Sequence, residues 1–195
     1  MSKKGNNIIG ILFIVLMVFI LTGIFINARL KEDKSSSYFN KEDRTGSKLL
    51  YENIMNLTEE KYPSSPDYVV RLYTDTQKLL YGDRIVNDTI VNNIIEKQRI
   101  LLSNKILTTN SLEQQEQLIL ENIKNIKENK VKVTRIDLKQ SIQDFKNNKK
   151  SYVKVAITDN LFQTYYYIYH LEIENGKWKI TGWYNTDENY NIIEQ

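Results

Sequence analysis

The chain has 195 residues, a mean hydropathy of −0.47, a net charge of +3 and no cysteine, which excludes disulfides, thiolate nucleophiles and cysteine-ligated metal sites. Two of the 27 basic residues, Lys3 and Lys4, precede a long apolar segment, and acidic and basic residues are nearly balanced in the rest of the chain. Because nucleic-acid binding needs a clustered basic surface, we expect no nucleic-acid partner.

The first predicted element is an apolar segment from Ile8 to Ile26. Only Gly10, Thr22 and Gly23 interrupt its large apolar side chains. At 1.5 Å per residue, a helix over this range is about 28 Å long, close to the hydrocarbon thickness of a bilayer. We therefore predict a short cytoplasmic tail over residues 1–7, then a single-pass transmembrane helix that contacts the lipid bilayer through Ile8 to Ile26.

We interpret this segment as a retained signal anchor. Residues 24–28 contain no A-x-A cleavage pattern, and Ile24 stands where a lipoprotein needs its lipidated cysteine. The basic residues that follow the segment outnumber Lys3 and Lys4, which by the positive-inside rule favours a domain inside the cell. Long domains translocate largely regardless of charge, so we expect the large C-terminal domain to be extracellular at the cell membrane.

A polar tether over residues 27–45 is predicted to precede a single domain over residues 46–190. Apolar residues at helical spacing, together with capping residues, indicate four helices in the first half of this domain. Ser111 and Gln114 have the spacing of a capping box. The four predicted helices start at Gly46, run from Ser65-Pro66-Asp67 to Gly82, run from Asp88 to Leu102, and start at Ser111.

After Asn129 the apolar period changes from helical to two. Four segments rich in β-branched and aromatic residues predict strands over Val131–Leu138, Tyr152–Thr158, Thr164–Ile173 and Lys177–Tyr184. Asn175-Gly176 is a strong hairpin signal. Helices followed by strands indicate an α+β fold, with helices packed on a curved four-stranded antiparallel sheet in meander order. Within the third strand we expect Tyr165, Tyr167 and Tyr169 to face the helices, and Tyr166, Ile168, His170 and Glu172 to face away.

Two stretches of sequence carry a resemblance to a known family. They are Lys61-Tyr62-Pro63-Ser64-Ser65-Pro66, followed by Val69-Val70 and Leu72-Tyr73, and the later Trp178-Lys179-Ile180-Thr181-Gly182-Trp183. The chain resembles uncharacterised single-pass membrane proteins of low-GC Gram-positive bacteria, whose soluble part is similar to the cone-shaped nuclear-transport-factor-2-like fold. That resemblance implies a curved sheet closed by helices over a pocket, and it implies no activity.

A few residues are candidates for chemistry. Asp137 shares a predicted strand face with Val131 and Val133, and with a tyrosine donor from Tyr165, Tyr167 or Tyr169 it could serve an isomerase-like pocket. An ion pair between Asp137 and Arg135 is the simpler explanation. His170, the single histidine, lies beside Glu172 but lacks an identifiable orienting partner.

Trp178 and Trp183, five positions apart on one strand, are predicted to lie on opposite faces of the sheet. We assign no catalytic, cofactor-binding or metal-ligand residues and no cofactor. The sequence favours a membrane-anchored, non-enzymatic binding module at the cell envelope, with a protein partner or self-association through the soluble domain. The alternatives are a small pocket enzyme of the isomerase or dehydratase kind, and a scaffold component of an envelope secretion or conjugation machine.

Overall fold

The computed structural model describes residues 42–82, 88–139, 141–143 and 149–193. The predicted transmembrane helix, and the tether up to residue 41, lie outside these residues. Of the helices that are described, none combines the length and the apolar character needed to cross a bilayer.

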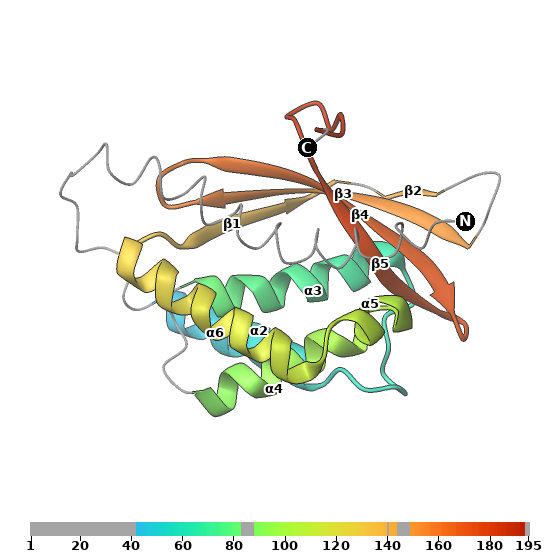
Figure 1. The fold of residues 1–195 in the computed structure, drawn as a ribbon, viewed down its shortest axis with the longest axis horizontal. Coiled ribbons are helices and arrows are strands. Elements are labelled where there is room, and N and C mark those ends of the chain that lie inside the picture. Colours follow the sequence, from blue (N-terminus) through green and yellow to red (C-terminus); the bar gives the residue numbers. More distant parts are fainter. Residues whose placement is uncertain (1–41, 83–87, 140, 144–148, 194–195) are drawn as a thin grey trace, which may run out of the picture.

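The fold consists of a sheet, a helix across one of its faces, and further helices behind that helix (Figure 1). The central helix contacts the sheet on one side and three other helices on the other. Most of its side chains are buried, including the polar Thr74, Thr76 and Gln77, as expected for a helix between two layers. The helices are α2 (Glu42–Met55), α3 (Pro66–Tyr81, the central helix), α4 (Asp88–Ile100), α5 (Asn104–Thr109) and α6 (Leu112–Asn129).

Local capping explains where these helices begin. The Ser65 hydroxyl accepts a hydrogen bond from the Tyr68 amide at 3.3 Å, and Pro66 occupies the first turn of α3. The predicted capping box of α6 is confirmed, with both reciprocal bonds between Ser111 and Gln114 at 3.1 Å. Two features differ from prediction: α2 begins at Glu42, before the predicted start, and the short helix α5 had no prediction.

The strands form an antiparallel sheet in the order β1-β3-β4-β5, which confirms the α+β class and the meander order. A short unpredicted strand, β2, also pairs with β3, continuing the edge formed by β1. Asn175 and Gly176 both have positive φ, 51° and 77°, as a tight hairpin turn requires. The strands are β1 (Val133–Leu138), β2 (Ile142–Gln143), β3 (Lys150–Asp159), β4 (Thr164–Glu174) and β5 (Lys177–Thr186).

An irregularity in β5 changes which side chains face the helices. Ile180 pairs with Leu171, but the next pair joins His170 to Gly182, so that one residue of β5 is extra. An extra residue reverses the alternation of side chains beyond it. As a result Trp178 and Trp183 both pack toward the helices, and the prediction that they lie on opposite faces is wrong.

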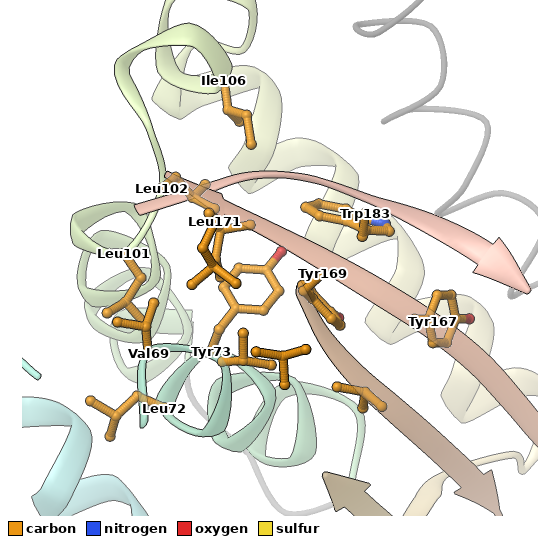
Figure 2. Packing of buried hydrophobic residues seen from close by; sticks show 14 of the residues in the cluster. Val69, Leu72, Tyr73, Leu101, Leu102, Ile106, Tyr167, Tyr169, Leu171 and Trp183 are labelled. Atoms are coloured by element: carbon orange, nitrogen blue, oxygen red, sulfur yellow. The ribbon is translucent and has the colours of Figure 1, made fainter. Parts of the chain in front are cut away.

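The main core lies between α3 and the sheet (Figure 2). Its centre is aromatic: Tyr73 of α3 lies 5.7 Å from the ring of Tyr169 and 5.8 Å from that of Trp183. Such tilted and edge arrangements suit the charge distribution of aromatic rings. A second core joins α2, α3, α4 and α6 behind the first, and includes Ile54, Leu80, Ile94, Ile95 and Ile119.

A buried chain of hydrogen bonds also connects the helices. The Gln98 amide donates to the Thr76 hydroxyl at 2.9 Å and accepts from the Gln115 amide at 3.1 Å. Arg99 donates to the Gln115 side chain at 2.8 Å and to the Asn110 carbonyl at 3.0 Å. Because buried polar groups need partners, this chain fixes how α3, α4 and α6 pack together.

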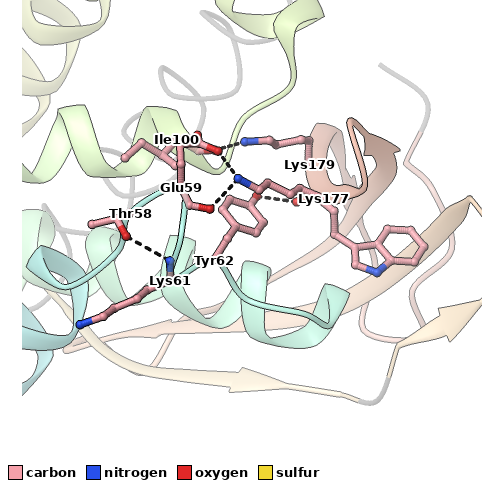
Figure 3. Close-up of polar contacts among 8 residues, drawn as sticks. Thr58, Glu59, Lys61, Tyr62, Ile100, Lys177 and Lys179 are labelled. Carbon is pink, nitrogen blue, oxygen red and sulfur yellow. Dashed lines mark hydrogen bonds and ion pairs between the residues drawn. The ribbon is translucent and has the colours of Figure 1, made fainter.

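A polar clamp joins the connection between α2 and α3 to the β4–β5 hairpin (Figure 3). The Tyr62 hydroxyl donates to the Trp178 carbonyl at 2.5 Å, and the Lys179 ammonium lies 4.5 Å from the centre of the Tyr62 ring. Lys177 pairs with Glu59, and this hydrogen bond lowers the pKa of that carboxyl. The clamp thus brings together the two stretches, around Tyr62 and around Trp178, that carry the family resemblance.

Candidate interaction surface

The inner face of the sheet is filled by aromatic rings. Tyr167 and Tyr169 are buried, and the Tyr169 hydroxyl donates to the Gln77 side chain at 3.4 Å. Burial raises the pKa of Tyr73, Tyr167 and Tyr169 well above the ordinary value, so these hydroxyls stay protonated at neutral pH. The predicted inward orientation of these β4 tyrosines is confirmed.

Asp137 does not join these tyrosines. Between Val133 and Arg135 the register of β1 against β3 shifts, so that Val133 packs on the core while Asp137 stands opposite Ala156 on the other face of the sheet. The prediction that Asp137 shares a face with Val133 is therefore wrong. Asp137 instead forms an ion pair with Arg135 at 2.8 Å, the simpler of the two explanations for its presence.

The sheet face turned away from α3, here named the outer face, carries no helix among the described elements (Figure 1). His170 lies at its centre, with its ring 4.5 Å from that of Tyr152 and 4.7 Å from that of Tyr184. Tyr152 and His170 are directly paired in the ladder between β3 and β4, and Tyr184 stands on β5. Three rings therefore form a row across three neighbouring strands.

The surroundings of His170 favour its neutral form. Burial between the two tyrosines lowers the pKa of His170, and Glu172 opposes this shift. Glu172 itself pairs with Lys150 at 3.2 Å across the strands. The His170 ring thus packs between the rings of Tyr152 and Tyr184. Among the described residues, the structure shows no hydrogen bond that would orient this ring as a base or a metal ligand.

The last described residues fold back beside the outer face. Asp187 accepts hydrogen bonds from the Asn189 and Asn191 amides at 2.9 and 2.8 Å, which closes a turn after β5. This turn places the Tyr190 ring 5.6 Å from the ring of Tyr166, and the Lys154 ammonium lies 4.8 Å from the centre of the Tyr190 ring. The result is a second aromatic contact on the outer face.

These contacts define the candidate interaction surface, the outer-face residues Tyr152, Lys154, Tyr166, Ile168, His170, Tyr184 and Tyr190. Tyr184 is 39% exposed and the others are partly exposed, so apolar ring surface faces solvent. Aromatic side chains give much contact area at low entropy cost and are enriched at protein interfaces. Chemically, this surface can bind by ring packing and by hydrogen bonds from its tyrosine hydroxyls other than that of Tyr190, which is buried.

The sequence predictions anticipated only part of this surface. The alternation of β4 indicated that Tyr166, Ile168 and His170 share a face, and this is confirmed. Tyr152 and Tyr184 were missed as members of the row, because the strand register that aligns them with His170 depends on the turn lengths and on the extra residue in β5. Among the residues that the structure describes, no group of three His, Asp or Glu side chains is arranged to hold a metal ion.

Comparison with known proteins gives a family and little else. No curated protein and no solved structure matches the chain. The family described as "Domain of unknown function (DUF6715)" matches residues 1–183, which is nearly the whole chain. The chain therefore belongs to this family, whose function is unknown.

Proposed function

We propose that this protein is a membrane-anchored, non-enzymatic binding module at the cell envelope, in which the outer face of the sheet contacts a protein partner or a second copy of the chain. The transmembrane helix over Ile8 to Ile26 holds the module at the membrane, and its large domain is extracellular. The soluble domain is of the nuclear-transport-factor-2-like kind, a proposal supported by helices packed on one face of an antiparallel meander.

The observation that carries this proposal is the row of rings Tyr152, His170 and Tyr184 on a sheet face that none of the described helices covers. These rings belong to neither hydrophobic core, and part of their surface meets solvent. Clustered, partly exposed aromatic groups are typical of binding surfaces. The inner face gives little support to the alternative of a pocket enzyme, because the acid Asp137 and the buried tyrosines lie on opposite sides of the sheet.

Site-specific photo-crosslinking in the full-length protein tests the proposal. A photoreactive amino acid replaces Tyr184 on the outer face or, as a matched control, Leu49, an apolar α2 residue that is 59% exposed. We expect a discrete crosslinked product, either a dimer or a complex with one partner, at position 184 and none at position 49. Equal or diffuse products at the two positions would contradict the proposal.

Mutation of Tyr152 then tests whether the partner binds through the aromatic ring or only lies near this surface. Truncation of an aromatic residue at the centre of an interface costs about 2 kcal/mol or more, a loss of binding of roughly thirtyfold. We expect Tyr152→Ala to remove the crosslink at position 184, while Tyr152→Phe, which keeps the ring, retains it. Loss of the product in both variants would indicate that the ring itself does not matter.

A further inference from the structure

The turn between β3 and β4 presents an apolar tip of unusual conformation. Phe162 is 90% exposed and has a φ of 63°, in the left-handed region that non-glycine residues rarely occupy, and Leu161 beside it is 36% exposed. A strained backbone that holds a large apolar side chain in water serves neither packing nor solubility. Such outliers persist where the surrounding structure imposes them, and they concentrate at functional sites.

Asp159 and Asn160 hold this turn in place. The buried Asp159 carboxylate accepts hydrogen bonds from the Leu161 amide at 2.8 Å and the Gln163 amide at 3.0 Å. The Asn160 side chain accepts from the Lys132 amide at 2.7 Å and donates to the Lys130 carbonyl at 3.1 Å. The tip is therefore preorganised, which lowers the entropy cost of binding through it.

The two hydrogen bonds of Asn160 hold the end of α6, with its basic residues, beside the turn that carries the apolar tip. Lys130 ends α6 and is exposed, and Lys127 lies exposed one turn earlier in the helix. The acid within the turn, Asp159, is only 4% exposed, and Glu128 pairs with Lys124. Apolar side chains beside lysines suit the interface of a bilayer with anionic lipids, because the apolar groups enter the acyl boundary while the ammonium groups meet headgroups.

The position of the tip in the fold indicates that the bilayer is its binding partner. Along the longest axis of the molecule, the β3–β4 turn, the end of α6 and the start of α2 lie at the same end (Figure 1). Packing agrees, since the end of α3 meets Val133 at the start of β1, and Val133 pairs with Asp159. The chain that links the apolar segment to the domain therefore joins it at the end that carries Phe162.

The length of that link keeps this end near the membrane. Residues 27–41 span at most about 50 Å when fully extended, and a flexible chain of this length averages roughly 20 Å between its ends. We infer that Leu161 and Phe162 insert into the membrane interface, with Lys127 and Lys130 at the anionic headgroups, so that the domain docks on the bilayer in one orientation. This inference rests on the membrane anchor of the proposed function.

Single-cysteine labelling tests the docking, because the chain has no cysteine of its own. The full-length protein carries a cysteine in place of Phe162 or, as a control, in place of Tyr68, which is 48% exposed at the start of α3 and thus at the opposite end. Each variant is labelled with an environment-sensitive fluorophore. It is then reconstituted into vesicles of phosphatidylglycerol and phosphatidylcholine in equal parts, with and without a lipid-borne quencher.

We expect a blue shift and quenching at position 162 that exceed those at position 68 several-fold, and a decrease at position 162 when phosphatidylglycerol is omitted. Lys130→Glu should weaken quenching at position 162 for the same electrostatic reason. Flotation of the vesicles reports on the anchor separately. A chain that floats but shows no quenching at position 162 overturns the docking alone, whereas a chain that does not float overturns the anchor and the docking together.

A protein site at the tip would give another pattern. In that case the lipid-borne quencher has no effect at position 162, and an added protein shields the position from an aqueous quencher. This result overturns the inference and assigns the tip to a protein partner. Phe162→Gly, which suits the left-handed backbone, should fold normally and lose the lipid contact. If this variant docks as tightly as the wild-type protein, the exposed ring is not the inserted group.

Discussion

At the scale of single residues, Asp75 and His170 make the stability of the domain depend on pH in opposite directions. Burial raises the pKa of Asp75 from 3.8 to about 6, against the effect of Arg71 and Lys78. The folded state therefore binds more protons than the unfolded state between about pH 4 and 6, so Asp75 makes stability fall as pH rises. Burial lowers the pKa of His170 below 6.5, so His170 makes stability fall as pH decreases through that value.

Asp75→Asn should separate these two contributions. We expect the variant to be more stable at pH 8 by about 1 kcal/mol, a value reduced from the full shift because the carboxyl is partly solvated. Between pH 5 and 7 its stability should then rise with pH, as His170 alone requires. Urea unfolding followed by tryptophan fluorescence measures this, and His170→Asn should change the profile in the opposite sense. Identical profiles for Asp75→Asn and the wild-type protein would contradict the burial of Asp75.

At the scale of elements, hydrogen-bonded side chains at helix ends and between helices hold the helical layer together. The capping box satisfies amides at the start of α6, and the buried Gln98 joins α4 to both α3 and α6. The capping box is a local interaction, and it stabilises only the helix that it caps. The hydrogen bonds of Gln98, in contrast, determine how helices that are far apart in the sequence pack on each other.

The two kinds of contact should differ in their cost when removed. Ser111→Ala should lower the free energy of unfolding by about 1 kcal/mol through loss of the cap. Gln98→Leu should lower it by about 2 kcal/mol or more, because the buried Thr76 hydroxyl and Gln115 amide lose a partner. Thermal unfolding of the full-length protein gives both values. Ser65→Ala, which removes the cap of α3, provides a comparison for Ser111→Ala, and a larger loss for either cap variant than for Gln98→Leu would contradict this ranking.

At the scale of the whole molecule, the proposed module has two separate surfaces. The aromatic outer face of the sheet is proposed to contact a protein, and the Phe162 tip is proposed to contact the bilayer. The β3–β4 turn stands at one end of the long axis (Figure 1), whereas the row of rings lies on the outer face of the sheet, so docking through the tip leaves that face open to a partner. Both surfaces act at the membrane only if the domain is anchored there.

The side of the membrane is tested by protease protection of a C-terminal tag on the full-length protein. We expect protease added to intact cells to remove the tag, because the large domain is proposed to be extracellular. A tagged cytoplasmic protein serves as the control for cell integrity. A tag that becomes sensitive only after lysis would place the domain inside the cell, as the count of basic residues after the apolar segment suggests.

Much of the fold follows from the sequence because it depends on local patterns. The amphipathic spacing of α3, the capping box at Ser111, the alternation along β4 and the positive φ values at Asn175-Gly176 each follow from residues close together in the chain. The apolar stretch from Ile8 to Ile26 is a feature of the same local kind. These signals were enough to predict the order of the longer helices and strands and the α+β class, whereas the short elements α5 and β2 were not predicted.

Tertiary structure decided which side chains share a face. One extra residue in β5 placed Trp178 and Trp183 on the same side of the sheet, and a register shift in β1 moved Asp137 away from the tyrosines. Register depends on strand pairing over long distances in the sequence, and an extra residue leaves no mark in local composition. The row of rings around His170 and the exposed position of Phe162 depend on that pairing, so only the folded chain could reveal them.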